Sequence, residues 1–531
     1  MSLVLFEHAF LTPPPEVAIE NIFERPYDNA VATARTCYSS RGIVTSRQVS
    51  GDDIEDPERR RERQALRDHI ARSIYKAGHH TTLGHAHIQF RLANVSRQLI
   101  WSFLHSHPFY NSEQVSQRYV EVGPENVIVP SLGGEALSVY QETVRLQMAA
   151  YRRLVEDLSP VVSEAYETIF PARKGNAKYE GEVKKRAQEV ARYVLPVGTF
   201  AYLYHTVSLL TLLRYHRLCL EYDAPLEQRE VVGLMVQRVL ERDPQVEKIL
   251  EDPLPPEENP EHLLLQKADP SGSREFVEQF DASLEGKASR LVDWKARNEE
   301  ILAESVREVF GLTRVRLSDD DAIALVLDPS RNHLLGSSLN LGAHSKLLRA
   351  LVHAGYTFRK KLSHTADSQD QRHRMTPASR PSLLAQLRDA PDFIEPILIQ
   401  KHEGIRTRYR EVMERAWDGI SRLGRLGVPA EFRAYLLPNA VAVRFTESAD
   451  LLNLRHKLAS RLCYNAQDEI WSASREEAMQ IREVNPRIGK YLLPPCGHRF
   501  LAQEKPICPE GSRFCGVPVW RLDLSEYRRL L

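Results

Sequence analysis

The sequence predicts a helix-rich α+β protein built from two tandem domains. Segments with apolar residues at three- and four-residue spacing, typical of amphipathic helices, outnumber the strand-like runs. A stretch rich in Pro, Glu and Gly divides the 531 residues into two parts of about equal length. The two parts carry short motifs in the same order, which indicates an internal repeat.

Individual elements follow from these patterns. The predicted helices are Glu142–Leu158, Leu209–Leu220, Leu341–Leu351 and Trp471–Val484, and the predicted strands are Ile88–Val95 and Asn126–Val129. The charged segment Val49–Gln64 predicts a solvated loop that leads into a helix. The segment Glu251–Ser273 predicts a linker, because its prolines and glycines interrupt helical structure. We therefore expect a first domain at 1–250, a linker at 251–290, a second domain at 291–490 and a C-terminal tail at 491–531.

Composition excludes several classes of protein. Lys plus Arg and Asp plus Glu number 71 each, so no overall field favours nucleic acid or a membrane surface. No apolar run approaches the ~18 residues that span a bilayer. The first residues lack the pattern of a signal peptide, and six cysteines in so long a chain do not form a secreted disulfide framework. We expect a cytoplasmic protein that binds neither nucleic acid nor membrane.

The repeat is clearest around two Leu-Pro pairs. Tyr193–Pro196 reads YVLP and Tyr435–Pro438 reads YLLP, and a helix-like stretch follows each. Upstream, His105–Tyr119 and Gln371–Leu384 lie at similar distances from their Leu-Pro pairs. The order and spacing indicate an old duplication.

Two motifs in the second part resemble those of the flavin-dependent thymidylate synthases. Arg372-His373-Arg374, seven residues and then Ser382 resemble the family signature. Ser460–Ile470 (SRLCYNAQDEI) resembles its closing motif, in which an activating Arg precedes Ala-Gln-x-Glu-Ile, and Arg461 falls on that Arg. The two motifs stand in the family's order and separation.

The first part carries complementary pieces of the same resemblance. Gly78-His79-x-Thr81 resembles the start of the family's flavin-contacting region, with His85 as its second histidine. Gln114-x-Ser116-x-Arg118-Tyr119 resembles the nucleotide-binding end of the signature. Arg192, four residues before Pro196, fits a further nucleotide contact.

The resemblance implies two tandem domains of the flavin-dependent thymidylate synthase fold and a cytoplasmic methyltransferase. Such an enzyme converts dUMP to dTMP with FAD, methylene-tetrahydrofolate and NADPH. Arg461 would be catalytic, because a cation beside the uracil stabilises the charge that develops on the ring. The implied substrate contacts are Gln114, Ser116, Arg118, Arg192, Gln369 and Arg372, and the implied flavin contacts are His79, Thr81, Arg372, His373 and Arg374. The family is tetrameric, so a tandem chain implies a homodimer.

Each part lacks roughly what the other keeps. Ser106-His107-Pro108 stand at the Arg-His-Arg positions of the first part, and Cys219 replaces the activating Arg. In the second part, Leu384 and Ala434 replace the counterparts of Arg118 and Arg192. Because the family's active site lies between subunits, the pattern predicts one composite site built from both halves.

Other departures leave alternatives open. The helix after each Leu-Pro pair departs from the Asn and Arg residues that the family uses for the nucleotide end of the flavin. The residues there are Asp450, Leu452 and His456 in one half and Ser208, Leu210 and Arg214 in the other. The chain is then also consistent with a divergent pyrimidine-modifying flavoenzyme, or with a pseudoenzyme that binds a nucleotide without turnover. Ser116 and Arg118 in a solvated loop, Arg192 at a helix end and Arg461 in an ion pair are the corresponding structural interpretations.

The tail contains a separate candidate site. Cys496, His498, Cys508 and Cys515 lie close together in the sequence, with Pro and Gly between them. Three thiols and an imidazole form a set that Zn²⁺ accepts, although the spacing is not a standard paired motif. Structural zinc is one interpretation, and free thiols in a reducing compartment are the other.

Overall fold

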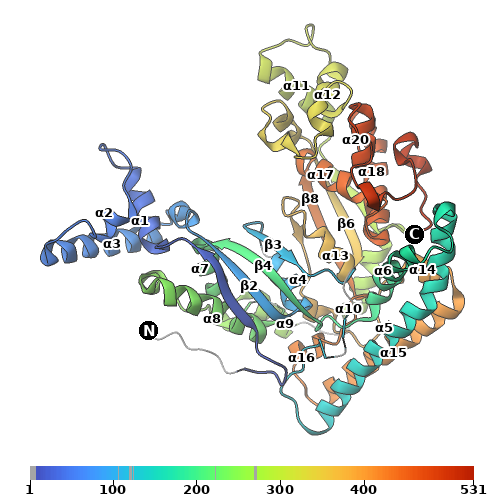
Figure 1. The fold of residues 1–531 in the computed structure, drawn as a ribbon, viewed down its shortest axis with the longest axis horizontal. Coiled ribbons are helices and arrows are strands. Elements are labelled where there is room, and N and C mark those ends of the chain that lie inside the picture. Colours follow the sequence, from blue (N-terminus) through green and yellow to red (C-terminus); the bar gives the residue numbers. More distant parts are fainter. Residues whose placement is uncertain (1–7, 106, 119–121, 124, 222, 268–271) are drawn as a thin grey trace.

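The computed structural model describes residues 8–105, 107–118, 122–123, 125–221, 223–267 and 272–531. Two four-stranded antiparallel sheets, one in each half of the chain, lie among many helices (Figure 1). The predicted helix-rich α+β class with two tandem units is confirmed.

The first half contains one sheet and the helices around it. Its strands are β1 (Glu16–Ile22), β2 (His87–Ser96), β3 (Tyr110–Gln114) and β4 (Phe200–Ser208). Its helices are α1 (Pro26–Thr36), α2 (Ser46–Ser50), α3 (Pro57–Lys76), α4 (Arg97–His105), α5 (Gly134–Ile169), α6 (Glu180–Ala191), α7 (Leu209–Arg217) and α8 (Pro225–Arg242). Helices α1 to α3 form the arm at the left of Figure 1.

The second half repeats this arrangement. Its strands are β5 (Ser289–Trp294), β6 (Gly355–Ser363), β7 (Ala378–Ser379) and β8 (Ala442–Asp450). The helices from the linker onward are α9 (Pro260–Lys267), α10 (Gly272–Ser283), α11 (Asn298–Phe310), α12 (Asp319–Leu327), α13 (His364–Asp370), α14 (Ile397–Gln400), α15 (Glu403–Arg425), α16 (Ala430–Ala434), α17 (Leu451–Arg461), α18 (Asp468–Val484), α19 (Pro486–Gly489) and α20 (Pro495–Leu501).

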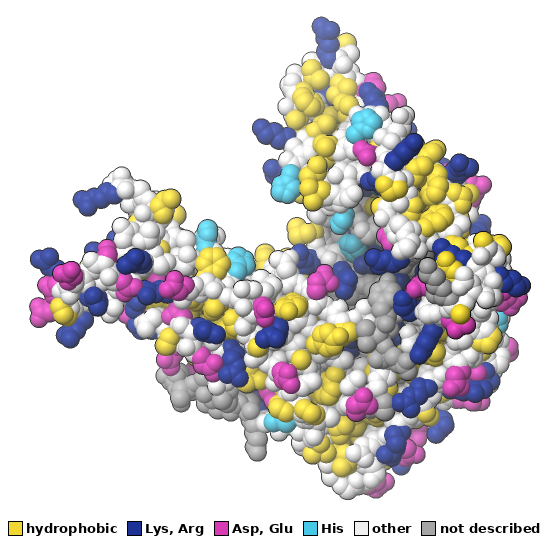
Figure 2. Space-filling view, in the orientation of Figure 1, with side chains coloured by type: hydrophobic (Ala, Val, Ile, Leu, Met, Phe, Trp, Pro, Cys, Tyr) yellow, Lys and Arg dark blue, Asp and Glu magenta, His cyan; other side chains and the backbone are white. Residues whose placement is uncertain are grey.

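Both sheets have the same topology. Their strand orders are β1-β2-β4-β3 and β5-β6-β8-β7, so equivalent strands occupy equivalent positions. A helix starts directly after each central strand, α4 after β2 and α13 after β6. Figure 2 shows the surface hollowed between the arm and the lobe of α11 and α12.

The two halves join through the backbone of the Leu-Pro segments. Val197 N donates to Leu437 O and Gly198 N to Tyr435 O, both at 2.8 Å, and Asn439 N donates to Leu195 O at 2.8 Å. The backbones run antiparallel, so the pairing relates the halves by an approximate two-fold axis. A Cβ added at Gly198 would lie 2.9 Å from Tyr435 O, so this close approach requires glycine.

A buried glutamate reinforces the junction on each side of the axis. Glu227 accepts hydrogen bonds from Ser96 N and Ser96 Oγ at 2.6 Å and from Tyr435 Oη at 2.9 Å. Glu469 accepts the equivalent bonds from Ser363 and from Tyr193. In each case the tyrosine comes from the other half. We call these two sets the tyrosine clamps.

The two longest helices complete the junction. Helices α5 and α15 pack along each other (Figure 1). The Gln147 amide of α5 donates to Val194 O at 3.3 Å and Leu436 O at 3.0 Å, one from each Leu-Pro segment. One continuous group of buried apolar side chains crosses both halves.

Three predicted elements differ in the structure. Leu341–Leu351 forms the short 3-10 turns Leu341–His344 and Leu348–His353, not an α-helix. Asn126–Val129 contributes only an isolated bridge between Val127 and Thr199. The predicted linker, 251–290, contains helices α9 and α10 and the first residues of β5; α9 starts at Pro260, where proline is well accommodated. Among the described residues, no helix is long and apolar enough to cross a bilayer.

The tyrosine clamps predict a measurable stability effect. In Tyr435→Phe, one buried hydrogen bond to Glu227 is lost, and we expect the free energy of unfolding to fall by about 1–2 kcal/mol. Denaturant unfolding measures the change. The matched control is Tyr38→Phe, because Tyr38 is 90% exposed. Equal stability of the two variants would show that the hydrogen bond from Tyr435 to Glu227 does not stabilise the fold.

Candidate active site

Five arginines from both halves gather beside the junction. Arg97, Arg118 and Arg192 come from the first half, and Arg372 and Arg461 come from the second; we call them the arginine cluster. Burial, with Arg192 and Arg372 nearby, lowers the pKa of Arg97 to about 9. Burial also lowers the pKa of Arg461 to about 10, with Arg372 and Arg118 adding to the effect. Like charges this close favour an anionic ligand.

Arg97 was not identified from the sequence. It is the first residue of α4, directly after the clamped Ser96. Its guanidinium donates to Gln114 Oε1 at 2.8 Å and Val115 O at 2.5 Å. The only signal in the sequence is an arginine that follows a buried strand, and His364 occupies the equivalent position in the second half.

The two nucleotide arginines predicted in the first half lie in different environments. Arg118 contacts the Glu189 carboxylate through Nε and donates from Nη2 to Asn465 O of the second half at 2.9 Å. Arg192 is only 5% exposed, and its Nε and Nη2 have no hydrogen-bond partner among the described residues. A buried guanidinium with unsatisfied donors is costly unless a ligand supplies acceptors.

Arg461 is held by the Arg-His-Arg segment. Its Nε donates to His373 Nε2 at 2.9 Å and its Nη2 donates to Gln369 O at 2.5 Å. The first bond requires an unprotonated Nε2 on His373. Burial and the nearby Arg461 and Lys457 lower the pKa of this imidazole well below its ordinary value, which favours that form. The contacts fix the direction of the Arg461 guanidinium.

A cavity of about 430 Å³ opens beside the cluster, and both halves line it. Arg372 and Arg374 come from the segment after α13, and Tyr110 and Gln114 come from β3. Arg374 donates to Asn111 Oδ1 at 3.0 Å, and its guanidinium lies 5.2 Å from the centre of the Tyr110 ring. The predicted Arg-His-Arg segment of the second half therefore meets the predicted nucleotide strand of the first.

A buried network of ion pairs lies next to the Arg-His-Arg segment, at the end of α13. Lys360 pairs with Asp370 at 2.7 Å and with Glu477 at 2.8 Å, and Lys457 pairs with Asp370 at 2.9 Å and also with Glu447. These side chains have no exposed surface. Asp370 is the last residue of α13, so the network fixes the start of the Arg-His-Arg segment.

The first half has an aromatic core at the equivalent place. Counted from Ser96 and from the Leu-Pro pair, Phe103, His205 and Tyr215 stand opposite Asp370, Glu447 and Lys457. The rings of Phe103 and Tyr215 lie 4.2 Å apart, and His205 lies 5.0 Å from Phe103. His107 contacts Tyr215 Oη at 2.8 Å. The two halves thus differ in their cores as well as in their motifs.

The remaining predicted contacts lie apart from the cluster or serve local structure. His79 and Thr81 are exposed near the 3-10 turn His80–Gly84, with no hydrogen bond to the cluster within the described ranges. Ser116 Oγ accepts from Arg118 N at 3.3 Å. Gln369 Nε2 is buried without a partner in the described part of the chain. Ser106 and Tyr119 lie outside the described residues.

The positions that depart from the family's flavin contacts have structural roles. Ser208 caps the N-terminus of α7 and Asp450 caps that of α17. The His456 ring lies 6.0 Å from the His373 ring, edge to face. Cys219, at the lost activating position, is buried, and burial raises its pKa to about 11.

The structure does not support the predicted zinc site. His498 is buried, and its Nε2 lies 3.1 Å from Tyr491 O, a contact that engages this ring nitrogen. Cys496, Cys508 and Cys515 instead line a small cavity together with Cys463. Among the described residues, no group of three or more His, Cys, Asp or Glu is arranged to hold a metal ion.

A family model and several curated proteins match this chain. The family model described as Thymidylate synthase complementing protein matches residues 20–245 and 291–487. A flavin-dependent thymidylate synthase of Sulfurisphaera tokodaii is 29% identical over 30% of this chain and 62% of its own length. That of Saccharolobus solfataricus is 29% identical over 28% of this chain and 56% of its own length. That of Clostridium tetani is 24% identical over 43% of this chain and 92% of its own length. The chain thus matches about six tenths of the first two relatives.

The Arg192 guanidinium, whose Nε and Nη2 have no partner among the described residues, should lower the stability of the ligand-free protein and strengthen anion binding. In Arg192→Met, a buried charge is replaced by an apolar side chain of similar length, so we expect the ligand-free protein to gain about 1–3 kcal/mol of stability. The same change should weaken anion binding. Thermal unfolding with and without phosphate measures both, with the exposed Arg152→Met on α5 as the control. A less stable Arg192→Met protein would show that this guanidinium is satisfied without a ligand.

Proposed function

This chain belongs to the thymidylate synthase complementing protein family, and we propose that it methylates dUMP to dTMP with FAD and methylene-tetrahydrofolate at one composite site per chain. The observation that carries the proposal is the arginine cluster, to which both halves contribute. The three relatives described above are named as flavin-dependent thymidylate synthases and are 24–29% identical to this chain.

The first half would hold the nucleotide phosphate. The unpartnered donors of Arg192, together with Arg118 and the hydroxyl of Ser116, offer charge-assisted hydrogen bonds to a dianion. Arg97 adds positive charge and holds Gln114 in place. Glu189 is the counter-ion of Arg118 without a ligand, so phosphate would compete with it for the guanidinium.

The second half would act on the base. Arg461 would lie against the uracil and stabilise the negative charge that develops when C5 becomes nucleophilic. Gln369, with its unsatisfied buried amide, and Arg372 would fix the ring. Burial raises the pKa of both Cys219 and Cys463 to about 11, so neither thiol is suited to attack the ring.

The residues around the 430 Å³ cavity fit a flavin ring. Arg372 and Gln114 line it with polar groups, and Tyr110 and Tyr204 line it with aromatic ones. Arg372, His373 and Arg374 would hold the ring side, and reduced flavin would supply the hydride, with NADPH as its reductant. His373 would act by orienting Arg461, because its Nε2 already accepts from that guanidinium.

His79 and Thr81 suggest a second copy of the chain. Both are exposed and without a described contact to the cluster, although the resemblance assigns them to the flavin. We propose that they reach the flavin of a partner chain in a homodimer. In that arrangement two tandem chains would provide four domains.

A nucleotide-binding pseudoenzyme is the second candidate. It is favoured by Ser208 and Asp450, which cap helices at positions where the family contacts the flavin's nucleotide end. A divergent flavoenzyme acting on another pyrimidine nucleotide is the third. Spectra and isotope exchange separate these candidates.

The composite site predicts one nucleotide per chain. Calorimetric titration with dUMP should saturate at one equivalent, because each half has only part of the site. Replacing Arg118 or Arg461 by Ala should cost ~2–4 kcal/mol in binding or turnover, since each change removes a charge-assisted contact in a desolvated site. The exposed Arg152→Ala is the control. Two bound nucleotides per chain would exclude the shared site.

Flavin binding is predicted separately. Purified protein should show flavin absorption bands or acquire them when FAD is added. Arg372→Ala should weaken this binding, because it removes a cation from the cavity wall. Protein that binds dUMP but no FAD at high concentration would favour the pseudoenzyme.

Chemistry at C5 is the direct test of turnover. With reduced flavin, the protein should release deuterium from C5-labelled dUMP, and Arg461→Ala should abolish the release without loss of the fold. Formation of dTMP should require methylene-tetrahydrofolate. Flavin-loaded protein that binds dUMP and leaves the label in place would refute the proposed reaction.

A further inference from the structure

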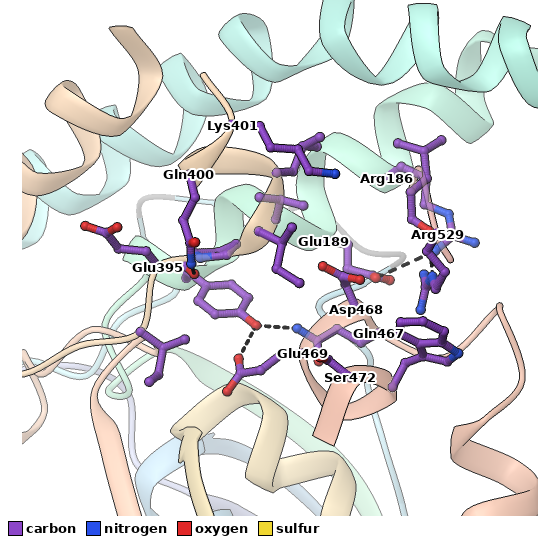
Figure 3. Close-up of a pocket in the computed structure, with 18 of the residues that line it drawn as sticks. Arg186, Glu189, Glu395, Gln400, Lys401, Gln467, Asp468, Glu469, Ser472 and Arg529 are labelled. Atoms are coloured by element: carbon purple, nitrogen blue, oxygen red, sulfur yellow. Dashed lines mark hydrogen bonds and ion pairs between the residues drawn. The ribbon is translucent and has the colours of Figure 1, made fainter. Parts of the chain in front are cut away.

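A second cavity, of about 250 Å³, lies between α6, α14, α18 and the C-terminal segment (Figure 3). Apolar side chains form much of its wall, among them Val162, Val190, Ile397, Leu398 and Trp471. None of the residues proposed above to contact dUMP or flavin lines it. The proposed reaction therefore leaves this cavity without a role.

The approximate two-fold axis relates this cavity to a pocket that Phe10 of the first half fills. There the Phe10 side chain is 5% exposed, and its ring lies 5.9 Å from the rings of both Phe432 and Tyr435. Phe10 also forms a backbone bridge with Pro130. An aromatic ring is thus the natural occupant of this pocket.

The counterparts of these pocket residues all line the cavity. Val190 and Tyr193 stand before Pro196 as Phe432 and Tyr435 stand before Pro438. Pro396 corresponds to Pro130, because Ile394 N donates to Ala440 O as Ile128 N donates to Gly198 O, both at 2.9 Å. Val190 is smaller than Phe432, which leaves more room. The cavity is therefore lined by the counterparts of the residues that contact Phe10, together with Leu530 and Leu531 of the C-terminal segment.

Two cations lie at the rim of the cavity. Lys401 and Arg186 line it, and the Lys401 ammonium is close enough to Asp468 to act on its carboxyl electrostatically. Arg186 is 3.7 Å from Glu189, whose carboxylate already holds Arg118. In Figure 3 the labelled charged side chains surround the cavity from different elements.

Three other acidic side chains line the cavity, and one of them, Glu469, already accepts from Ser363 and Tyr193. Glu395 is paired with Arg406 at 2.9 Å and also with Arg410. Burial raises the pKa of Asp468, while the nearby Arg529 and Lys401 act in the opposite direction and offset its charge.

We propose that this cavity is a binding site for a small single-ring aromatic acid. The ring would occupy the position that Phe10 takes in the other half, between Tyr193, Val190 and Pro396. The carboxylate would meet Lys401 and Arg186 at the rim. The site is distinct from the proposed nucleotide site, so either can fail without the other.

Calorimetry of the full chain with 3-phenylpropionate tests the proposal. We expect saturable binding at one site per chain and no binding of the cationic analogue 2-phenylethylamine. Lys401→Ala should weaken binding about tenfold, the effect of one charge-assisted hydrogen bond. Lys76→Ala, an exposed lysine of α3, should leave it unchanged.

Filling the cavity provides the complementary variant. Val190→Phe introduces the residue found at the equivalent position 432, so we expect a folded protein that no longer binds 3-phenylpropionate. Thermal unfolding checks the fold. The proposal is overturned if 3-phenylpropionate shows no saturable binding at millimolar concentration, if the amine binds as well, or if neither Lys401→Ala nor a folded Val190→Phe protein weakens binding.

Discussion

The antiparallel pairing of the two Leu-Pro segments is the constraint on which the rest of the molecule depends. The same short stretch carries Arg192, Tyr193 and the paired backbone, so the junction and the site share one piece of chain. Asn439 Nδ2 donates to Arg192 O at 3.1 Å and so ties this arginine to the other half. Each tyrosine clamp then fixes the end of a central strand, from which α4 or α13 starts.

The clamps also explain how residues distant in sequence meet. Ser96 and Ser363 end equivalent strands; Arg97 is the first residue of the helix after Ser96, and the helix after Ser363 leads to the Arg-His-Arg segment. Trp101 of α4 donates to Asp367 of α13 at 2.9 Å, so these helices contact each other directly. The arginine cluster is therefore assembled by the junction, and unfolding of the junction would disperse it.

The sequence identified the fold class and most of the cluster, because the motifs survive as short segments with fixed spacing. Arg97 escaped because its role depends on contacts with Gln114 and Val115 across the sheet, and no local pattern encodes them. Leu341–Leu351 has helical periodicity, yet its tertiary contacts hold it in 3-10 turns. The tail cysteines suggested zinc because they lie close to His498 in the sequence. In the structure His498 is buried and its Nε2 contacts Tyr491 O instead. The sequence also gave no sign that the Phe10 pocket has a counterpart in the 250 Å³ cavity, because the correspondence depends on the two-fold axis.

Joining the halves in one chain changes what mutation can do. In a symmetric dimer every substitution appears on both sides of the axis, so a change that improves one site must also suit its twin. Here Ala440 stands at the position equivalent to Gly198, and Ala434 at the position equivalent to Arg192. The buried ion network of the second half likewise corresponds to an aromatic core in the first. The two halves therefore differ at equivalent positions, both in their motif residues and in the cores beneath them. Covalent linkage also makes the association of the two halves independent of protein concentration. A symmetric dimer, by contrast, would dissociate when diluted.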